Sequence, residues 1–262
     1  MIDIGFLGLG KMGSALLQGI LKNKVFDARA IAFYAPSPET KAKGKSLGLA
    51  LATNEIALFD VARIIVLAIK PQKYDEVFAL LKGLDFEGKT IVSLAPGKSI
   101  RSLKAVFPGA RIVRAMPNTP ALIGQGVTTI AFDGEPIPEI LSVFASIGTY
   151  AVVEEKQIDE AIPLNGSMPA YLFSFVKAFV DCGVSHGFSE QQARELALRS
   201  VIGSCELALN SPLDFDGLIG QVCSKGGSTL AGLEQLNEKG FIEAIEACYE
   251  ACVSRSKELG DA

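Results

Sequence analysis

The sequence contains a single histidine, His186, and no tryptophan. Ser–His–Asp and Cys–His catalysis each require an imidazole, so either mechanism would depend on His186 alone. That residue stands in the segment SHGF, just before a predicted helix start at Ser189, a context typical of the C-terminal turn of a helix. We therefore expect no catalytic triad or dyad of this kind.

Cysteine is also scarce, and all five cysteines fall in the last third of the chain: Cys182, Cys205, Cys223, Cys248 and Cys252. Cys248 and Cys252 are spaced to share a helix face. A metal site would need histidine or further cysteine partners at suitable spacing, and none follows from the pattern. We expect ordinary buried or half-buried thiols and no bound metal.

Basic clusters and long apolar runs are missing as well. The net charge is −4, and without a basic block a nucleic-acid partner is not expected. The longest apolar stretches, such as ARIIVLAIKP, are too short to span a bilayer. The N-terminus, MIDIGFLGLG, has no basic start before an apolar run. We therefore expect no signal peptide, a cytoplasmic location and no membrane partner.

What the sequence does contain is an alternation of short apolar runs and helical patterns. Strand-like runs occupy 3–7, 30–35, 63–69, 90–95 and 111–116, and helical patterns occupy 14–23, 38–48, 73–82 and 99–107. Continuous apolar strands separated by helices predict a parallel sheet covered on both faces. Residues 126–132 and 149–153 should add strands at the far edge, around a helix at 138–147. The sequence thus predicts the α/β class, with residues 1–155 forming an N-terminal Rossmann domain around a doubly wound sheet.

After about residue 155 the strand signals stop and helical patterns continue. The segment SMPAYLFSFVKAFVDCGVSHG is apolar on most faces, and Ser189 with Gln192 forms a capping-box pattern. Further helices are expected near 213–223, 229–238 and 240–259. A helix with so little polar surface needs a burial partner, and a neighbouring subunit is the natural one. Residues 156–262 are therefore predicted to form an all-helical C-terminal domain that pairs with a second copy.

The turn after the first strand reads GLGKMG, with the glycine spacing of a dinucleotide-binding loop. Gly8 permits the tight turn, Gly10 lets the backbone approach a pyrophosphate, and Gly13 allows the helix to lie close to the strand. The amides that open the helix, around Lys11 and Met12, would then face the phosphates. Because the motif directly follows a strand and begins a helix, it predicts a nucleotide site; a purely structural glycine turn is the alternative.

The region after the second strand indicates which nicotinamide cofactor is used. An NAD site usually has Asp or Glu at the end of this strand, but FYAPSPETK has no acid before Glu39. Ser37, with Lys41 or Lys43 nearby, suits a 2′-phosphate better. We therefore expect NADPH, with NADH as the alternative.

Three further loops, AIKPQ, SLAPG and RAMPNTPA, follow strands of the predicted sheet. Ligands bind such sheets in the crevice at the carboxyl ends of the strands. Lys70 and Pro71 should therefore lie beside the cofactor, and Asn118 should offer its amide near the reacting ring. Three such loops at one edge predict a crevice there.

Together these segments resemble the pyrroline-5-carboxylate reductase family. The resemblance runs through GFLGLGKMGSALLQGIL, AIKPQ, RAMPNTPA, LNGSMPAYLF and CSKGGSTLAGL, in the family's order and spacing, and covers essentially the whole chain. The last motif is the most specific, because many dehydrogenases share glycine fingerprints. The resemblance implies a Rossmann domain, a helical dimerisation domain, and NAD(P)H-dependent reduction of a cyclic imine to L-proline by a homodimer or a ring of dimers.

The resemblance also assigns site residues. It places Thr229 at the imine nitrogen as the catalytic residue, and the substrate carboxylate at backbone amides of a helix N-terminus. A cyclic imine readily takes up a proton, so a hydroxyl that donates a hydrogen bond is sufficient. The expected substrate-binding residues are Gly226, Gly227, Ser228, Thr229, Asn118 and Met168. The expected cofactor-binding residues are Gly8, Gly10, Lys11, Met12, Gly13, Ser37, Asn54, Ala68, Lys70, Pro71, Ala95 and Gly97.

The chain departs from the family pattern at several positions. Where the family reads SGSGPAY this chain has NGSMPAY, which introduces Asn165 and Met168. SPGGTT becomes SKGGST with Lys225, FIEA becomes FVKA with Lys177, and Pro96 stands where alanine is common. Substrate preference is the property that the changes at Asn165, Met168 and Lys177 bear on. At Met168, a methionine in place of a very small residue either reshapes the imine pocket or repacks a helix start.

Alternative functions follow from these departures. One is reduction of a six-membered piperideine carboxylate, because a pocket does not strongly reject one extra methylene. Another is a catalytically weak NADP-binding paralogue with a regulatory role. A 3-hydroxyacid dehydrogenase fits less well, because its catalytic lysine follows a glycine-rich helix start by only a few residues, and Lys177 comes eleven residues after Gly166.

Overall fold

The computed structural model describes residues 2–69 and 73–261, and its contacts divide the chain into two compact units. The first unit comprises Met1–Pro169 with Cys252–Ala262, and the second comprises Ala170–Ala251. Helix α8 (Met168–Ser185) begins in the first unit, and helix α12 (Phe241–Asp261) ends in it. The last turns of the C-terminal helix therefore belong to the sheet unit.

The sheet unit contains eight strands in the order β3-β2-β1-β4-β5-β6-β7-β8 over the described residues. They are β1 (Ile2–Leu7), β2 (Ile31–Tyr34), β3 (Ala50–Leu51), β4 (Ala62–Leu67), β5 (Thr90–Ser93), β6 (Arg111–Pro117), β7 (Gly126–Phe132) and β8 (Gly148–Val152). Neighbouring strands are parallel except β6 and β7, which are antiparallel. The strand order reverses between β1 and β4, where a doubly wound sheet opens its ligand crevice.

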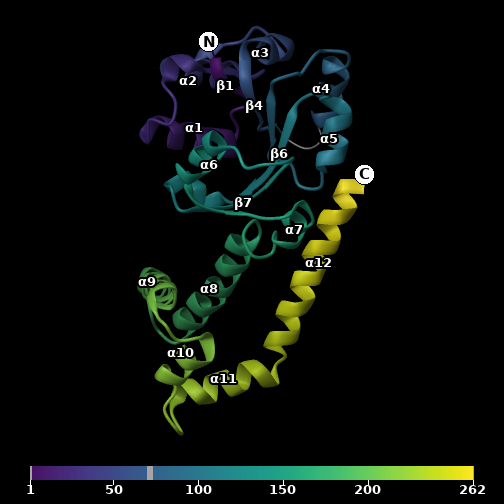
Figure 1. The fold of residues 1–262 in the computed structure, drawn as a ribbon. Helices are drawn as coiled ribbons and strands as arrows, with labels where there is room; N and C mark the ends of the chain where they lie inside the picture. Colours follow the sequence, from purple (N-terminus) through teal and green to yellow (C-terminus); the bar gives the residue numbers. More distant parts are fainter. Residues whose placement is uncertain (1, 70–72, 262) are drawn as a thin grey trace. The chain divides into compact units, whose positions relative to one another are not determined.

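Helices cover both faces of this sheet. They are α1 (Lys11–Lys22), α2 (Pro38–Ser46), α3 (Glu55–Val61), α4 (Tyr74–Leu81), α5 (Ile100–Val106), α6 (Pro138–Ala145) and α7 (Glu155–Glu160), with short 3₁₀ turns η1 (Ala28–Ala30) and η3 (Thr119–Ile123). Figure 1 shows α1 and α6 on one side of the sheet and α4 and α5 on the other. This arrangement confirms the predicted α/β class and doubly wound sheet.

The core divides into two clusters because strand side chains alternate between faces. Phe6 and Val66 lie with α1 and α6 in one cluster, and Leu7 and Leu67 lie with α3, α4 and α5 in the other. Strands buried on both faces explain the continuous apolar runs in the sequence.

Several elements were not predicted. Helix α3 was missed because it passes directly into β4, so its apolar residues merge with the strand's apolar run. Helix α7 is short and polar, and a capping box between Glu154 and Gln157 starts it. The antiparallel direction of β7 was also not foreseen, because strand direction depends on the path of the connection and not on local composition.

The second unit is entirely helical, as predicted. After α8 come α9 (Glu190–Asn210), α10 (Phe215–Val222), α11 (Ser228–Glu238) and α12. The predicted capping box is present, with Ser189 and Gln192 exchanging hydrogen bonds at the start of α9. His186 follows the end of α8, is exposed, and places its Nδ1 2.8 Å from the carbonyl oxygen of Cys182, which agrees with a helix C-terminal turn.

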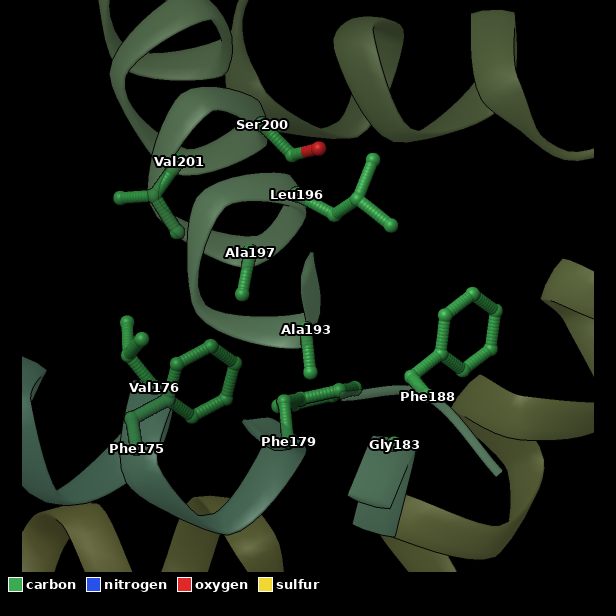
Figure 2. A pocket seen from close by; sticks show the side chains of 10 residues that line it. All are labelled: Phe175, Val176, Phe179, Gly183, Phe188, Ala193, Leu196, Ala197, Ser200 and Val201. Atoms are coloured by element: carbon green, nitrogen blue, oxygen red, sulfur yellow. The ribbon is translucent and has the colours of Figure 1, made fainter. Parts of the chain in front are cut away.

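This helical unit has almost no closed core of its own. Among its described residues only Val176 and Ala193 are buried hydrophobic side chains, whereas large residues such as Phe179 and Leu196 are more than half exposed. Figure 2 shows Phe175 and Phe179 of α8 facing Ala193 and Ala197 of α9 across an apolar hollow. The hollow has a volume of about 390 Å³. An isolated chain would leave this surface in water, at a large free-energy cost.

Candidate functional site

The glycine loop between β1 and α1 has the geometry of a nucleotide-binding turn. Gly8 has a φ of +89°, which favours glycine, and its N–H donates to the Tyr34 carbonyl at the end of β2 at 2.8 Å. A Cβ at Gly13 would lie 2.8 Å from the Gly8 carbonyl oxygen and 3.1 Å from the Ala68 Cβ. Gly13 therefore permits the close approach of helix and strand, and the structure brings Gly8, Gly13 and Ala68 together.

Gly10 differs from these two glycines. It is the N-cap of α1, and a Cβ added there would meet nothing closer than the Ala68 carbonyl oxygen at 4.0 Å. Packing within the protein therefore does not require glycine at this position. The empty space lies beside the first-turn amides of Lys11 and Met12, where a pyrophosphate would bind.

This contrast predicts different outcomes for two alanine substitutions. Gly10→Ala should fold normally but weaken NADPH binding by roughly 10- to 100-fold, since overpacking costs about 1–3 kcal/mol. Gly13→Ala should instead destabilise the protein, because its Cβ would collide with backbone. Thermal unfolding and a fluorescence titration with NADPH separate the two effects. Unchanged NADPH affinity in Gly10→Ala would contradict a pyrophosphate at this turn.

Side chains at the ends of β2 and β3 begin helices. Ser37 caps α2 by accepting from the Thr40 N–H at 3.1 Å, and Asn54 caps α3 by accepting from the Ala57 N–H at 2.8 Å. Lys41 follows the first turn of α2 and is half-buried, and Lys43 lies in the last turn of this helix and is exposed. The cofactor roles predicted for Ser37 and Asn54 stay predictions, but both residues lie at the expected edge of the sheet.

The loops after β4 and β5 lie at the same edge. Ala68 extends the pairing of β4 with β1, donating its N–H to the Leu7 carbonyl at 2.9 Å, while Ala95 is buried and Gly97 has a φ of +77°. The predicted cofactor residues Lys70 and Pro71 lie outside the described residues.

Tyr74, which sequence patterns did not single out, joins these two strand ends. Its hydroxyl donates to the Leu67 carbonyl at 3.1 Å and lies 3.4 Å from the Ser93 Oγ. Burial raises the pKa of Tyr74 to about 12, so the phenol stays protonated at neutral pH and keeps its donor. The sequence signal for a tyrosine that joins the ends of β4 and β5 is its position directly after a strand-end loop.

The end of β6 is held by two buried carboxamides. Asn118 accepts from the Val127 N–H at 2.8 Å and donates to the Asn165 carbonyl at 3.1 Å. Asn165 donates to the Met116 carbonyl at 2.8 Å. Asn165 was noted in the sequence only as a departure from a family pattern, and its contacts across the sheet edge were not foreseen.

A buried arginine on β6 was missed entirely. Arg114 is 3% exposed and pairs with Glu155 at 3.3 Å and Asp159 at 3.1 Å. Glu155 also accepts from the Ile100 N–H at the start of α5, and Asp159 accepts from the Ser256 hydroxyl of α12 at 3.0 Å. A charged residue inside an otherwise apolar strand was the available signal. The cluster fixes α5, α7 and the end of α12 to the sheet.

The loop before α11 is the second turn with the features of an anion site. Gly226 has a φ of +73°, and the Gly227 N–H donates to the Ser224 carbonyl at 2.9 Å. Gly227 is the N-cap of α11, and Ser228 and Thr229 follow in its first turn. Thr229 is exposed and lines a hollow of about 420 Å³ with residues of α9 and α10.

Helix starts among the described residues differ in whether a side chain caps them, and α4 and α6, whose N-caps are Lys73 and Ile137, have no such cap. Helices α2, α3, α5, α9 and α10 begin with a side chain that accepts an amide hydrogen of the first turn. Helices α1 and α11 instead begin with Gly10 and Gly227, which have no side chain to do so. Their first-turn amides are left for another acceptor, and an anion is favoured there.

Two departures from the family pattern lie on α8. Met168 is its first residue and is 42% exposed. Lys177 is on the exposed surface of the helix, where its ammonium pairs with Asp181 one turn later, and this pairing raises the pKa of Lys177. A solvent-exposed, ion-paired lysine is unsuited to act as a buried catalytic lysine, which argues against the 3-hydroxyacid dehydrogenase alternative.

The predicted residues thus fall into two sets. The glycine loop, Asn118 and the loops after β4 and β5 belong to the sheet unit, and Gly226, Gly227, Ser228 and Thr229 belong to the helical unit. Within the described ranges, no three side chains of His, Cys, Asp or Glu are grouped to hold a metal ion. No helix among the described residues is long and apolar enough to cross a membrane.

Comparisons with known proteins match two parts of the chain to two family models. Residues 155–259 match the family model described as pyrroline-5-carboxylate reductase dimerisation, and residues 3–97 match the model described as NADP oxidoreductase, coenzyme F420-dependent. The solved structure of Plasmodium falciparum pyrroline carboxylate reductase, which has NADP bound, is similar with a TM-score of 0.87 and 29% identity, covering 99% of this chain and 98% of that one.

Curated relatives extend the similarity over the full length. The pyrroline-5-carboxylate reductase of Escherichia coli is 32% identical over 98% of this chain and 97% of its own length. The enzyme of that name from Haemophilus influenzae is 34% identical with the same coverage. Because curated relatives of this name are 32% and 34% identical over 98% of the chain, the chain belongs to the pyrroline-5-carboxylate reductase family.

Proposed function

We propose that this enzyme reduces 1-pyrroline-5-carboxylate to L-proline with NADPH. The observation that carries the proposal is the similarity of nearly the whole chain, at 32% and 34% identity, to reductases named for this substrate. The ranges matched by the two family models, 3–97 and 155–259, include the glycine loop of the sheet unit and the loop that begins α11.

The residues of the sheet unit fit a nicotinamide dinucleotide. The space at Gly10 and the first-turn amides of α1 would accept the pyrophosphate. Ser37, Lys41 and Lys43, with no acid at the end of β2, favour a 2′-phosphate and therefore NADPH over NADH. The NADP bound in the Plasmodium falciparum relative supports the same choice. When bound, NADPH supplies the hydride.

The helical unit carries the residues proposed to handle the imine. The substrate carboxylate would accept from the first-turn amides behind Gly226 and Gly227, where the helix dipole favours negative charge. Thr229 Oγ would donate a hydrogen bond to the imine nitrogen or relay a proton to it. In the balanced reaction the imine carbon gains a hydride and the nitrogen ends with one added proton, so the C=N bond becomes a secondary amine.

Self-association is part of the proposal. The helical unit buries few of its large apolar side chains within one chain, and its sequence matches a dimerisation family. A homodimer would cover the apolar faces of α8 and α9 (Figure 2), and a ring of dimers would use the same pairing.

The assay that tests this function follows the loss of NADPH absorbance with pyrroline-5-carboxylate. The six-membered piperideine carboxylate and NADH are compared in parallel. We expect turnover with the five-membered ring and a higher kcat/KM for NADPH than for NADH. Absence of turnover with either ring would reject the enzyme reaction and favour a regulatory NADP-binding protein; preference for the larger ring would reassign the substrate.

A further inference from the structure

Two buried asparagines form one hydrogen-bonded unit at the carboxyl end of β6. Asn118 is 7% exposed and Asn165 is 3% exposed. The Asn118 carboxamide uses its oxygen to accept from the Val127 N–H at 2.8 Å and its nitrogen to donate to the Asn165 carbonyl at 3.1 Å. Its oxygen is thus committed to the protein backbone, which leaves little of this side chain to bind a substrate.

Asn165 makes its own set of contacts. Its Nδ2 donates to the Met116 carbonyl at 2.8 Å and lies 3.5 Å from the Thr129 hydroxyl, while its Oδ1 accepts from the Gly166 N–H at 2.6 Å. Together the two side chains connect the end of β6, the start of β7 and the turn at residues 165–167. Helix α8 begins immediately after that turn, at Met168.

We propose that Asn118 and Asn165 are positioning residues for the imine site, which act by fixing the 165–168 segment against the end of β6. This inference rests on the proposed function. It assigns Asn118 a different role from the direct substrate contact expected from the sequence. The residue whose position they set is Met168, which is 42% exposed at the start of α8 and therefore free to contact a ring.

The location at the sheet edge supports this role. The residues predicted to bind the pyrophosphate and the 2′-phosphate follow β1 and β2. Strand β6 lies on the other side of the β1–β4 switch point, beyond β4 and β5. The nicotinamide half of a dinucleotide extends in that direction. A side chain presented beside the end of β6 is thus near the reacting ring and far from the pyrophosphate, so the pair should affect the imine more than the cofactor.

The experiment compares Asn118→Ala, Asn165→Ala and the double variant with Asn23→Ala. Asn23 is an exposed control at the far end of α1, because its side chain also makes two hydrogen bonds to the backbone, in this case to the carbonyls of Gly19 and Ser146. For each variant, steady-state kinetics give kcat and KM for the five- and six-membered imines, and fluorescence titration gives the NADPH Kd.

We expect each single variant to raise the KM of the five-membered imine roughly 10-fold, with the NADPH Kd within about twofold of wild type. The double variant should fall well short of the product of the two single effects, because the residues act through one connection. Asn23→Ala should leave both KM and Kd unchanged. Changes of NADPH Kd that parallel KM, or multiplicative effects in the double variant, would overturn the proposal.

A variant at Met168 keeps the test decisive if an asparagine variant does not fold. Met168→Ala changes a partly exposed side chain and should change the ratio of kcat/KM for the two rings at least roughly threefold, as expected for a few methylenes in a pocket. An unchanged ratio would reject the positioning role while wild-type turnover still supported the proposed function. No turnover by the wild-type enzyme would instead reject the function and this role together.

Discussion

Replacing Thr229 with alanine should lower kcat for pyrroline-5-carboxylate by about 100-fold, while the NADPH Kd changes less than about twofold. Thr229 lies in the first turn of α11, two residues after the glycine N-cap Gly227, on the helical unit. The cofactor is expected to bind the sheet unit, so loss of this hydroxyl should not disturb it. The measurement is steady-state kinetics together with fluorescence titration of NADPH.

The physical reason is the loss of a hydrogen bond that strengthens as the imine nitrogen gains electrons. Such an interaction stabilises the transition state more than the bound substrate, so kcat falls with only a small change in KM. Thr229→Ser keeps the hydroxyl and should retain most of the activity. An equal loss of NADPH affinity in Thr229→Ala would place the residue at the cofactor, and an unchanged kcat would remove it from the chemistry.

Replacing Phe179 with aspartate should convert a dimer into monomers and abolish most of the activity. Phe179 is 55% exposed in the single chain, packs against Phe175 with ring centroids 4.9 Å apart, and lines the hollow between α8 and α9 in Figure 2. An unpaired carboxylate in an apolar interface loses hydration without compensation. We expect the melting temperature to fall by roughly 10 °C.

Light scattering coupled to size-exclusion chromatography measures the oligomeric state, and thermal unfolding at several protein concentrations measures its link to stability. A wild-type dimer should melt at a higher temperature as concentration rises, because association stabilises the folded state. Phe179→Leu keeps the surface apolar and should remain dimeric. A wild-type protein that is monomeric, or a dimeric Phe179→Asp, would show that α8 and α9 are covered in another way.

Much of the fold could be read from local patterns. The central strands β1, β4, β5 and β6 are mostly buried, so their apolar runs are visible in the sequence. At the starts of α2, α5 and α9, a serine side chain caps an amide only three residues later. The spacing of Gly8, Gly10 and Gly13 likewise depends on one turn and its neighbouring strand. Each of these features is set by residues within a few positions of one another.

The candidate site was only partly predictable. The glycine loop and the loop before α11 were found because each combines glycine with a following helix. Asn165 and Arg114 were not assigned their roles, because their partners are far away in the sequence. Asn118 and Asn165 are 47 residues apart, and Arg114 and Asp159 are 45 apart. No local pattern encodes such pairs.

The sequence by itself therefore determined the alternation of strands and helices, the glycine turn at the first strand, and the apolar helices that need a partner. Only the tertiary structure decided that β7 runs antiparallel to β6, that the last turns of α12 belong to the sheet unit, and that Asn118 and Asn165 are bound to each other. The physical reason is the distance along the sequence over which each interaction acts. Hydrophobic periodicity and helix capping act over one or two turns, whereas strand direction and buried polar pairing depend on where distant segments meet.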